Sequence, residues 1–215
     1  MLKICEIFHS IQGESSFVGQ PCTFVRLSGC NLRCVWCDTQ YAYEEGRMVG
    51  IDEILRQVDD IGCPLVEVTG GEPMLQAKES CALMARLIAG GYTVLLETNG
   101  SLPLDDVPMG VHRIIDLKPP CSRVQHDENI WRHYAENWRD TDEIKCVVAS
   151  RDDFDWCLKK LSEYQTIGRV IIHCSPVWGA VAPADLAAWI CASKLPIRLN
   201  LQIQKVIWDP EKRGV

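Results

Sequence analysis

Three of the twelve cysteines in this chain, Cys30, Cys34 and Cys37, lie within eight residues of one another. They follow a strand-like stretch directly, which predicts a loop that could wrap three sulfurs around one inorganic centre. Soft thiolates select zinc or iron–sulfur over hard cations. A 4Fe-4S cluster usually takes four thiolates, so three local thiols would leave one iron with an open coordination site where chemistry could occur.

Two alternatives to an iron–sulfur loop remain open from the spacing alone. A structural zinc site usually needs two Cys-x2-Cys pairs, and the sequence has no second pair. A zinc site completed by Cys22 or His9 is one alternative, and cysteines that serve only in packing are the other.

A second motif, Gly70-Gly71-Glu72-Pro73, ends a predicted strand at residues 65–68. Glycines let a backbone approach a ligand closely, and a glutamate offers an anionic acceptor for an ammonium group. Taken alone, this tetrapeptide could equally be a tight turn.

Strands and helices alternate along the rest of the chain. Apolar runs of strand length occur at residues 23–27, 65–68, 93–96, 113–116, 144–148, 170–173 and 197–202. Patterns with helical periodicity occur at residues 51–61, 77–89, 152–163 and 183–191. Alternation of this kind predicts an α/β fold with a mostly parallel sheet. Seven strands with about four helices favour a shortened, partial (β/α) barrel over a closed eightfold one. We expect a loop or an overlying helix at residues 119–142.

Composition excludes several classes of protein. The 215 residues, 47% hydrophobic and 24% charged, predict one globular domain over residues 1–215. No apolar run reaches the roughly 18 residues of a spanning helix, so we expect no membrane partner. A net charge of −7 without Lys/Arg clusters argues against nucleic-acid binding. The N-terminus is too polar for a secretory signal, so we expect a cytoplasmic protein whose other cysteines are mostly small buried hydrophobic side chains.

The cysteine spacing, with Trp36 before the last cysteine, resembles the signature of the radical S-adenosylmethionine (SAM) superfamily. In that superfamily three cysteines hold a 4Fe-4S cluster, and the free iron binds the amino and carboxylate groups of SAM. The Gly-Gly-Glu-Pro segment resembles the motif that receives the cofactor's amino group. The resemblance therefore implies an enzyme in which Cys30, Cys34 and Cys37 are the catalytic cluster ligands.

Further segments resemble the 7-carboxy-7-deazaguanine synthase family. They are residues 8–14, 26, 37–39, 69–73, 97–100, 116–119 and 198–202. These lyases convert 6-carboxy-5,6,7,8-tetrahydropterin to 7-carboxy-7-deazaguanine with loss of ammonia, in the pathway to queuosine and other 7-deazapurines. The implied mechanism is reductive cleavage of SAM to a 5'-deoxyadenosyl radical, which takes a hydrogen atom from the carboxyl-bearing ring carbon before ring contraction.

The resemblance also implies a role for each matching residue. The implied substrate-binding residues are Ile11, Gln12, Gly13, Glu14, Arg26, Thr69 and Val215. The implied SAM-binding residues are Trp36, Cys37, Asp38, Gly71, Glu72, Asp116, Lys118 and Ser175. Thr39 is implied as a Mg²⁺ ligand, and such a hard ion keeps several waters, so one hydroxyl plus substrate oxygens makes a plausible shell.

Side-chain chemistry supports several of these roles. The planar fork of Arg26 suits bidentate capture of the pterin carboxylate. Gln12 and Glu14 offer the donors and acceptors that an aminopyrimidinone ring requires. Gly13 lets the backbone approach that ring.

This chain departs from the family pattern at two places. Asp116-Leu-Lys118 stands where many members have Ser-Pro-Lys, and Gln204 stands where the pattern Leu-x-Leu-His-Lys has histidine. In some members the terminal carboxylate reaches the substrate, and Val215 would do so by analogy.

Two other functions share part of this pattern. A radical SAM activase that installs a glycyl radical has the same cysteine spacing but gives no reason for Gln12, Glu14, Arg26 and Thr39. A non-catalytic iron–sulfur or zinc module gives no reason for the Gly-Gly-Glu-Pro segment. The expected partners are a small pterin substrate, an electron donor such as flavodoxin or ferredoxin and, by resemblance, a second copy in a homodimer.

Overall fold

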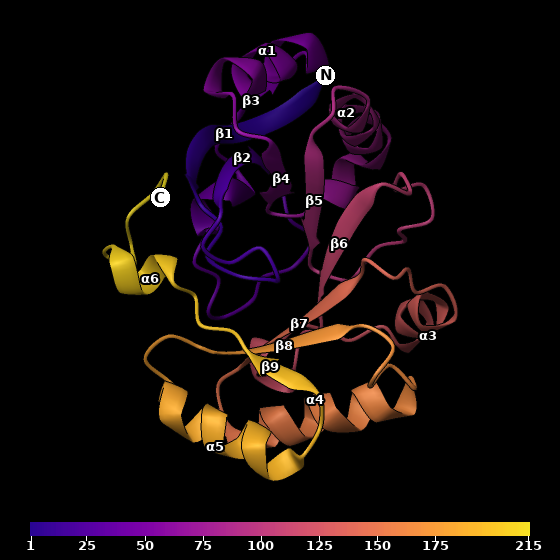
Figure 1. Ribbon diagram of the computed structural model, residues 1–215, viewed down its shortest axis with the longest axis vertical. Helices are drawn as coiled ribbons and strands as arrows, with labels where there is room; N and C mark the ends of the chain where they lie inside the picture. The colour runs from indigo at the N-terminus through magenta and orange to yellow at the C-terminus, as the bar shows by residue number, and fades with distance from the viewer.

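A single nine-stranded sheet organises the computed structural model, which describes residues 1–215 (Figure 1). The strands are β1 (Leu2–Ile11), β2 (Pro21–Leu27), β3 (Arg47–Val49), β4 (Leu65–Gly70), β5 (Thr93–Thr98), β6 (Val111–Asp116), β7 (Glu143–Val148), β8 (Ile171–Pro176) and β9 (Ile197–Leu199). The α-helices are α1 (Ile51–Ile61), α2 (Ala77–Ala89), α3 (Glu128–Glu136), α4 (Arg151–Glu163), α5 (Pro183–Ser193) and α6 (Gln204–Ile207). No helix is both long and apolar enough to span a bilayer.

The strand order is β3-β1-β2-β4-β5-β6-β7-β8-β9, and β3 and β9 do not pair with each other. Every neighbouring pair from β2 to β9 is parallel, whereas β1 runs antiparallel to β2 and β3. Helices α1 to α5 lie around the outside of the curved sheet, while α6 and the C-terminus lie on its other side (Figure 1). The predicted mostly parallel sheet and partial barrel are therefore confirmed.

The two faces of the sheet bury different side chains, because successive residues of a strand point to opposite faces. On β4, Val66 and Val68 belong to the large apolar core that includes Ile54 of α1 and Leu83 of α2. The residues between and after them, Glu67 and Thr69, line a cavity on the inner face.

A small apolar cluster fills the inner face on the amino-terminal side of that cavity. It contains Phe24 of β2, Leu65 of β4, Leu95 of β5 and Ile114 of β6. Two residues further along each of these strands stand Arg26, Glu67, Glu97 and Asp116, which line the cavity. The interior of the sheet is thus apolar at one end and charged at the other.

Sequence periodicity missed β1 and β3. A β-bulge between Ile4 and Glu6 shifts the register of β1 against β2, which breaks the alternation expected of a strand. β3 has only three residues, too few to show a period. The expected strand at residues 197–202 is also too long, because the chain leaves the sheet after Leu199.

Cysteine burial agrees with the prediction only in part. All twelve cysteines are free thiols. Of the nine outside the cluster loop, Cys22, Cys63, Cys146, Cys157 and Cys174 are buried. Cys5, Cys81 and Cys121 are half-buried, and Cys191 on α5 is exposed.

The segment at residues 119–142 contains α3. This helix is capped at its N-terminus by Asp127, whose carboxylate accepts hydrogen bonds from the backbone N–H groups of Asn129 and Ile130.

A buried ion pair fixes the connection between α3 and β7. Arg113 of β6 donates from Nε to Oδ1 of Asp142 at 2.7 Å, and Asp142 is fully buried. This pair ties β6 to the start of β7 and so helps to align the two strands that carry Asp116 and Lys145.

We predict that Asp142→Asn lowers the free energy of unfolding by about 3–5 kcal/mol, because the Arg113 cation is left buried and unpaired. Urea denaturation measures this change. The matched control is Asp52→Asn, which removes an exposed partner of Arg86 and costs at most about 1 kcal/mol. Equal losses in the two variants would show that the buried pair has no special weight.

Candidate active site

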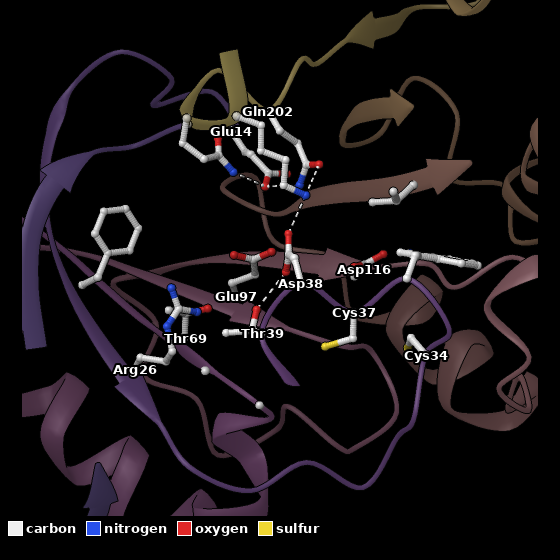
Figure 2. Close-up of a pocket in the computed structure, with 18 of the residues that line it drawn as sticks. Glu14, Arg26, Cys34, Cys37, Asp38, Thr39, Thr69, Glu97, Asp116 and Gln202 are labelled. Carbon is white, nitrogen blue, oxygen red and sulfur yellow. Dashed lines mark hydrogen bonds and ion pairs between the residues drawn. The ribbon is translucent and has the colours of Figure 1, made fainter. Parts of the chain in front are cut away.

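A cavity of about 460 Å³ lies on the inner face at the carboxyl ends of the strands. This is where ligands bind in parallel α/β sheets, and its size suits a small molecule. Its walls come from β1, β2 and β4 to β7, from the cysteine loop and from the C-terminal segment (Figure 2).

Most of the residues predicted from the sequence line this one cavity. They are Ile11, Gln12, Gly13, Glu14, Arg26, Cys30, Cys34, Trp36, Cys37, Asp38, Thr39, Thr69, Gly71, Asp116, Lys118 and Val215. Two predicted residues, Glu72 and Ser175, do not line it. In Figure 2, Arg26 lies at one end of the cavity, Cys34 and Cys37 lie at the other, and Thr39 lies between them.

The cysteine loop provides a donor set that fits an iron–sulfur cluster. The backbone N–H of Leu32 donates to Cys30 Sγ at 3.4 Å, and Asn99 Nδ2 lies 3.7 Å from the same sulfur. Burial raises the pKa of the Cys34 thiol, and the Lys118 ammonium opposes that rise. No three His, Cys, Asp or Glu side chains converge to hold one metal ion. A cluster needs no such convergence, because each thiolate binds a different iron.

Glu72 has a structural role in the turn after β4, and its predicted contact with SAM stays a prediction. Its side chain is fully buried, and its carboxylate accepts hydrogen bonds from Met74 N at 2.9 Å and Asn99 N at 2.7 Å. The hydroxyl of Thr98 donates to both carboxylate oxygens, at 2.9 and 3.0 Å. With its oxygens satisfied inside the protein, Glu72 fixes the turn that carries Gly71 and joins it to the end of β5.

Gly71 needs its missing side chain, because a Cβ there would lie 2.1 Å from the carbonyl oxygen of Gly29. The two glycine-containing loops therefore pack backbone against backbone. That contact holds the start of the cysteine loop beside the end of β4.

Asp116 and Lys118 form the wall next to the cysteines. They make an ion pair, and Asp116 raises the pKa of Lys118 against the effect of burial. Oδ1 of Asp116 is buried without a hydrogen-bond partner. An unpartnered carboxylate oxygen facing a cavity fits a hydroxyl-bearing ligand such as the ribose of SAM.

Ser175 lies on β8 beside Val147 of β7 and is fully buried outside the cavity. Its hydroxyl is buried without a hydrogen-bond partner, and its predicted role in the SAM site stays a prediction. Val177 and Trp178, which follow it, line the cavity instead.

Arg26 at the other end is held by β1. Its Nε donates to Glu6 Oε1 at 2.7 Å, and Tyr41 Oη donates to the same oxygen at 2.8 Å. Its guanidinium carbon also lies 5.6 Å from the ring centre of Phe8. Because Glu6 takes Nε, the two terminal nitrogens remain for a ligand carboxylate. Thr69 pairs with Arg26 in the β2–β4 register and lies beside it.

Thr39 and Asp38 place hard oxygen donors in the middle of the cavity. The Thr39 hydroxyl donates to Asp38 Oδ1 at 2.8 Å, and Lys205 Nζ lies 2.6 Å from Asp38 Oδ2. Burial raises the pKa of Asp38, but the Lys205 ammonium outweighs this and lowers the pKa to about 2. Hydroxyl and carboxylate oxygens are the donor types that Mg²⁺ prefers, so these residues fit that ion.

Sequence reasoning missed the charged groups on the cavity floor. Glu67 of β4, Glu97 of β5 and Lys145 of β7 all line it, and Lys145 Nζ lies 2.6 Å from Glu97 Oε1 and 2.7 Å from Glu14 Oε2. The sequence did offer one signal for these residues. Each is a charged residue inside a mostly apolar strand, which is costly to bury without a function or a partner.

The C-terminal segment covers the cavity from the side opposite the sheet. Gln202 Nε2 donates to Glu14 Oε1 at 2.8 Å, and Gln204 Nε2 lies 3.3 Å from the same oxygen. Gln204 Oε1 is buried without a partner. Arg213 pairs with Glu45 at 3.0 Å, which ties the tail to the segment after the cysteine loop.

Comparison with known proteins agrees with this arrangement. The profile of the Radical SAM superfamily matches residues 24–172. The chain is 46% identical to 7-carboxy-7-deazaguanine synthase of Chlorobaculum tepidum, over all of this chain and 97% of that protein. It is 40% identical to 7-carboxy-7-deazaguanine synthase of Koribacter versatilis, over the full length of both.

Solved structures show the same fold. The crystal structure of QueE from Escherichia coli superposes with a TM-score of 0.72 at 21% identity, over 93% of each chain. Streptococcus suis SuiB superposes with a TM-score of 0.56 at 17% identity, over 81% of this chain and 47% of that one. The full-length sequence relationship, together with the cysteine loop at the cavity, shows that this chain belongs to the 7-carboxy-7-deazaguanine synthase family of the radical SAM superfamily.

Proposed function

We propose that this chain converts 6-carboxy-5,6,7,8-tetrahydropterin to 7-carboxy-7-deazaguanine in the cavity described above. The observation that carries the proposal is the layout of that cavity. An arginine with two free nitrogens faces a three-cysteine loop across it, and the hydroxyl of Thr39 lies between them. Arg26 can therefore hold the ring by its carboxylate, with the adjacent reacting carbon on the side toward the cysteine loop.

The cofactors are a 4Fe-4S cluster, SAM and Mg²⁺. Cys30, Cys34 and Cys37 would hold the cluster. When bound, the cluster would supply the electron for reductive cleavage of SAM, and SAM would supply the radical chemistry. Trp36, Gly71, Asp116 and Lys118 would hold SAM, and Thr39 would bind Mg²⁺.

The protein's own residues position the substrate and exclude water, while the cofactors carry out the difficult chemistry. Arg26 would bind the pterin carboxylate and so fix the carbon that carries it. Gln12 and Glu14 would bind the aminopyrimidinone edge. The segment that carries Gln202 and Gln204 closes the cavity over that ring. Holding the reacting atoms in a near-attack geometry removes much of the entropic part of the barrier.

Two partners belong to the same proposal. The reductant, a flavodoxin or ferredoxin, would approach the outer side of the cysteine loop, where Val35 is 52% exposed. A second copy in a homodimer would cover apolar side chains near the sheet edge and α6, where Leu199 and Val206 are exposed. We propose a cytoplasmic location for the enzyme.

We predict that the anaerobically reconstituted enzyme, given SAM, reductant, Mg²⁺ and the pterin, forms 7-carboxy-7-deazaguanine detectable by mass spectrometry. Cys34→Ala abolishes this product because one iron loses its ligand. Cys191→Ala, which changes the exposed cysteine of α5, leaves product formation intact.

Other results would point to the alternatives. Formation of 5'-deoxyadenosine while the pterin stays intact would support a glycyl-radical activase. A protein that holds zinc and produces neither compound would be a binding module.

We predict that Arg26→Lys raises KM for the pterin by about 10- to 100-fold with a smaller change in kcat. Lysine keeps the positive charge but loses the fork, and one hydrogen bond to a charged group is worth about 1.5–3 kcal/mol. Steady-state kinetics of product formation measures both constants. Arg151→Lys, an exposed residue paired with Asp155, is the control. A wild-type KM in Arg26→Lys would rule out a carboxylate contact there.

We predict that Thr39→Ala raises the Mg²⁺ concentration needed for half-maximal activity by at least about tenfold, the effect of weakening a metal's coordination shell. Thr39→Ser keeps the hydroxyl and is the matched control, which should stay near the wild-type requirement. Titration of activity with Mg²⁺ measures the difference. The assignment would be wrong if the alanine and serine variants showed the same Mg²⁺ dependence.

A further inference from the structure

Lys145 stands in the middle of β7, and its side chain is only 8% exposed. Its ammonium bridges two carboxylates that come from distant parts of the chain. Nζ lies 2.7 Å from Glu14 Oε2, in the loop after β1, and 2.6 Å from Glu97 Oε1, near the end of β5. All three side chains line the cavity. No other cation makes an ion pair with either carboxylate.

A third acid, Glu67 of β4, lies beside this bridge but does not contact the ammonium. Glu67 is 2% exposed and accepts a hydrogen bond from Gln12 Nε2. Burial raises its pKa well above the usual range, and the charge of the neighbouring Glu97 and a hydrogen bond to it raise it further. The pKa of Glu97 is lowered because the Lys145 ammonium outweighs burial. Lys145 therefore favours the ionised form of Glu97, whereas burial disfavours the ionised form of Glu67.

These contacts link the polar side chains of the cavity floor. Gln12 donates to Glu67, and Lys145 pairs with both Glu97 and Glu14. The backbone N–H of Glu14 donates to Gln12 Oε1 at 3.1 Å. The loop after β1 is thereby joined to β4, and β7 is joined to that loop and to β5.

This arrangement matters because two carboxylates facing one cavity repel each other, and one of them takes up a proton when no cation lies between them. A protonated carboxylic acid offers one acceptor fewer to a ligand. An aminopyrimidinone ring presents adjacent N–H donors along one edge. Carboxylates that stay ionised and lie side by side offer acceptors for each of these N–H groups.

We infer that Lys145 is a positioning residue for the substrate ring, because its ammonium holds the carboxylates of Glu14 and Glu97 together on the cavity floor as acceptors for the ring's N–H groups. The inference rests on the proposed function, since that function supplies the ring. Lys145 does not itself touch the reacting carbon.

The test compares Lys145→Met with Lys145→Arg in the reconstituted enzyme. Methionine keeps the apolar stem and removes the charge, whereas arginine keeps the charge and moves the donors. We expect Lys145→Met to raise KM for the pterin about 10- to 100-fold, as for loss of a charged hydrogen bond, with a much smaller change in kcat. Lys145→Arg should recover part of the loss. Lys159→Met, on the exposed side of α4, is the control.

Two further readouts separate positioning from a merely structural role. The ratio of 5'-deoxyadenosine to 7-carboxy-7-deazaguanine should rise in Lys145→Met, because SAM cleavage continues while the ring is held poorly. Thermal unfolding and the visible absorbance of the cluster should stay close to wild type in Lys145→Arg. If Lys145→Met does not fold, Lys145→Gln takes its place as the variant without the charge; a KM above wild type in it supports the inference, and a wild-type KM overturns it.

Failure of this inference can be told apart from failure of the proposed function. In one outcome, the wild-type enzyme makes the deazaguanine while Lys145→Met folds and keeps the wild-type KM and product ratio. That result overturns only the role of Lys145. Wild-type enzyme that leaves the pterin unchanged overturns the proposed function first, and the positioning role with it.

Discussion

Burying charged side chains inside a sheet is costly unless each charge finds a partner, and this requirement governs the interior of the fold. Lys145 meets it by lying between Glu14 and Glu97. Removal of that one ammonium would leave two carboxylates facing each other in a space of low dielectric constant. The ion pairs also join β7 to β5 and to the loop after β1, so the groups that define the cavity floor also hold its walls together.

The rest of the site follows from how a parallel sheet presents its strand ends. Arg26, Glu67, Glu97, Asp116 and Lys145 come from five neighbouring strands and all face the same cavity. The apolar residues that precede four of them on the inner face form the small cluster beside that cavity. The loops after the strands then supply the cysteines and Thr39. In this way the sheet and the loops that follow its strands fix Arg26, Thr39 and the three cysteines relative to one another.

The sequence was sufficient for whatever depends on local spacing. The cysteine loop, the parallel strands and helices α1, α2, α4 and α5 show as motifs or periods. The Gly-Gly-Glu-Pro motif located the turn that carries Glu72. It did not indicate that the Glu72 carboxylate accepts hydrogen bonds from Thr98, Met74 and Asn99. Lys145 could not be assigned a role from periodicity, because a single lysine in β7 gives no indication of which distant acids pair with it.

The structure differs from the sequence prediction at two other places, β1 and the segment after Leu199. β1 escaped detection because a bulge shifts its alternation. The segment after Leu199 was expected to continue as a strand, but it leaves the sheet and places Gln202 near Glu14, a contact between residues 188 positions apart. Long-range contacts of this sort depend on how the whole sheet curves, which no local pattern records.

The most direct measurement is a crystal structure of the reconstituted enzyme, prepared without oxygen, with SAM, Mg²⁺ and 6-carboxytetrahydropterin bound. We predict that the pterin carboxylate contacts the terminal nitrogens of Arg26, that the amino edge of the ring contacts Glu14 and Glu97, and that the cluster sits on Cys30, Cys34 and Cys37. A pterin bound with its carboxylate at Lys118, or with its ring away from the two glutamates, would contradict this assignment of the cavity.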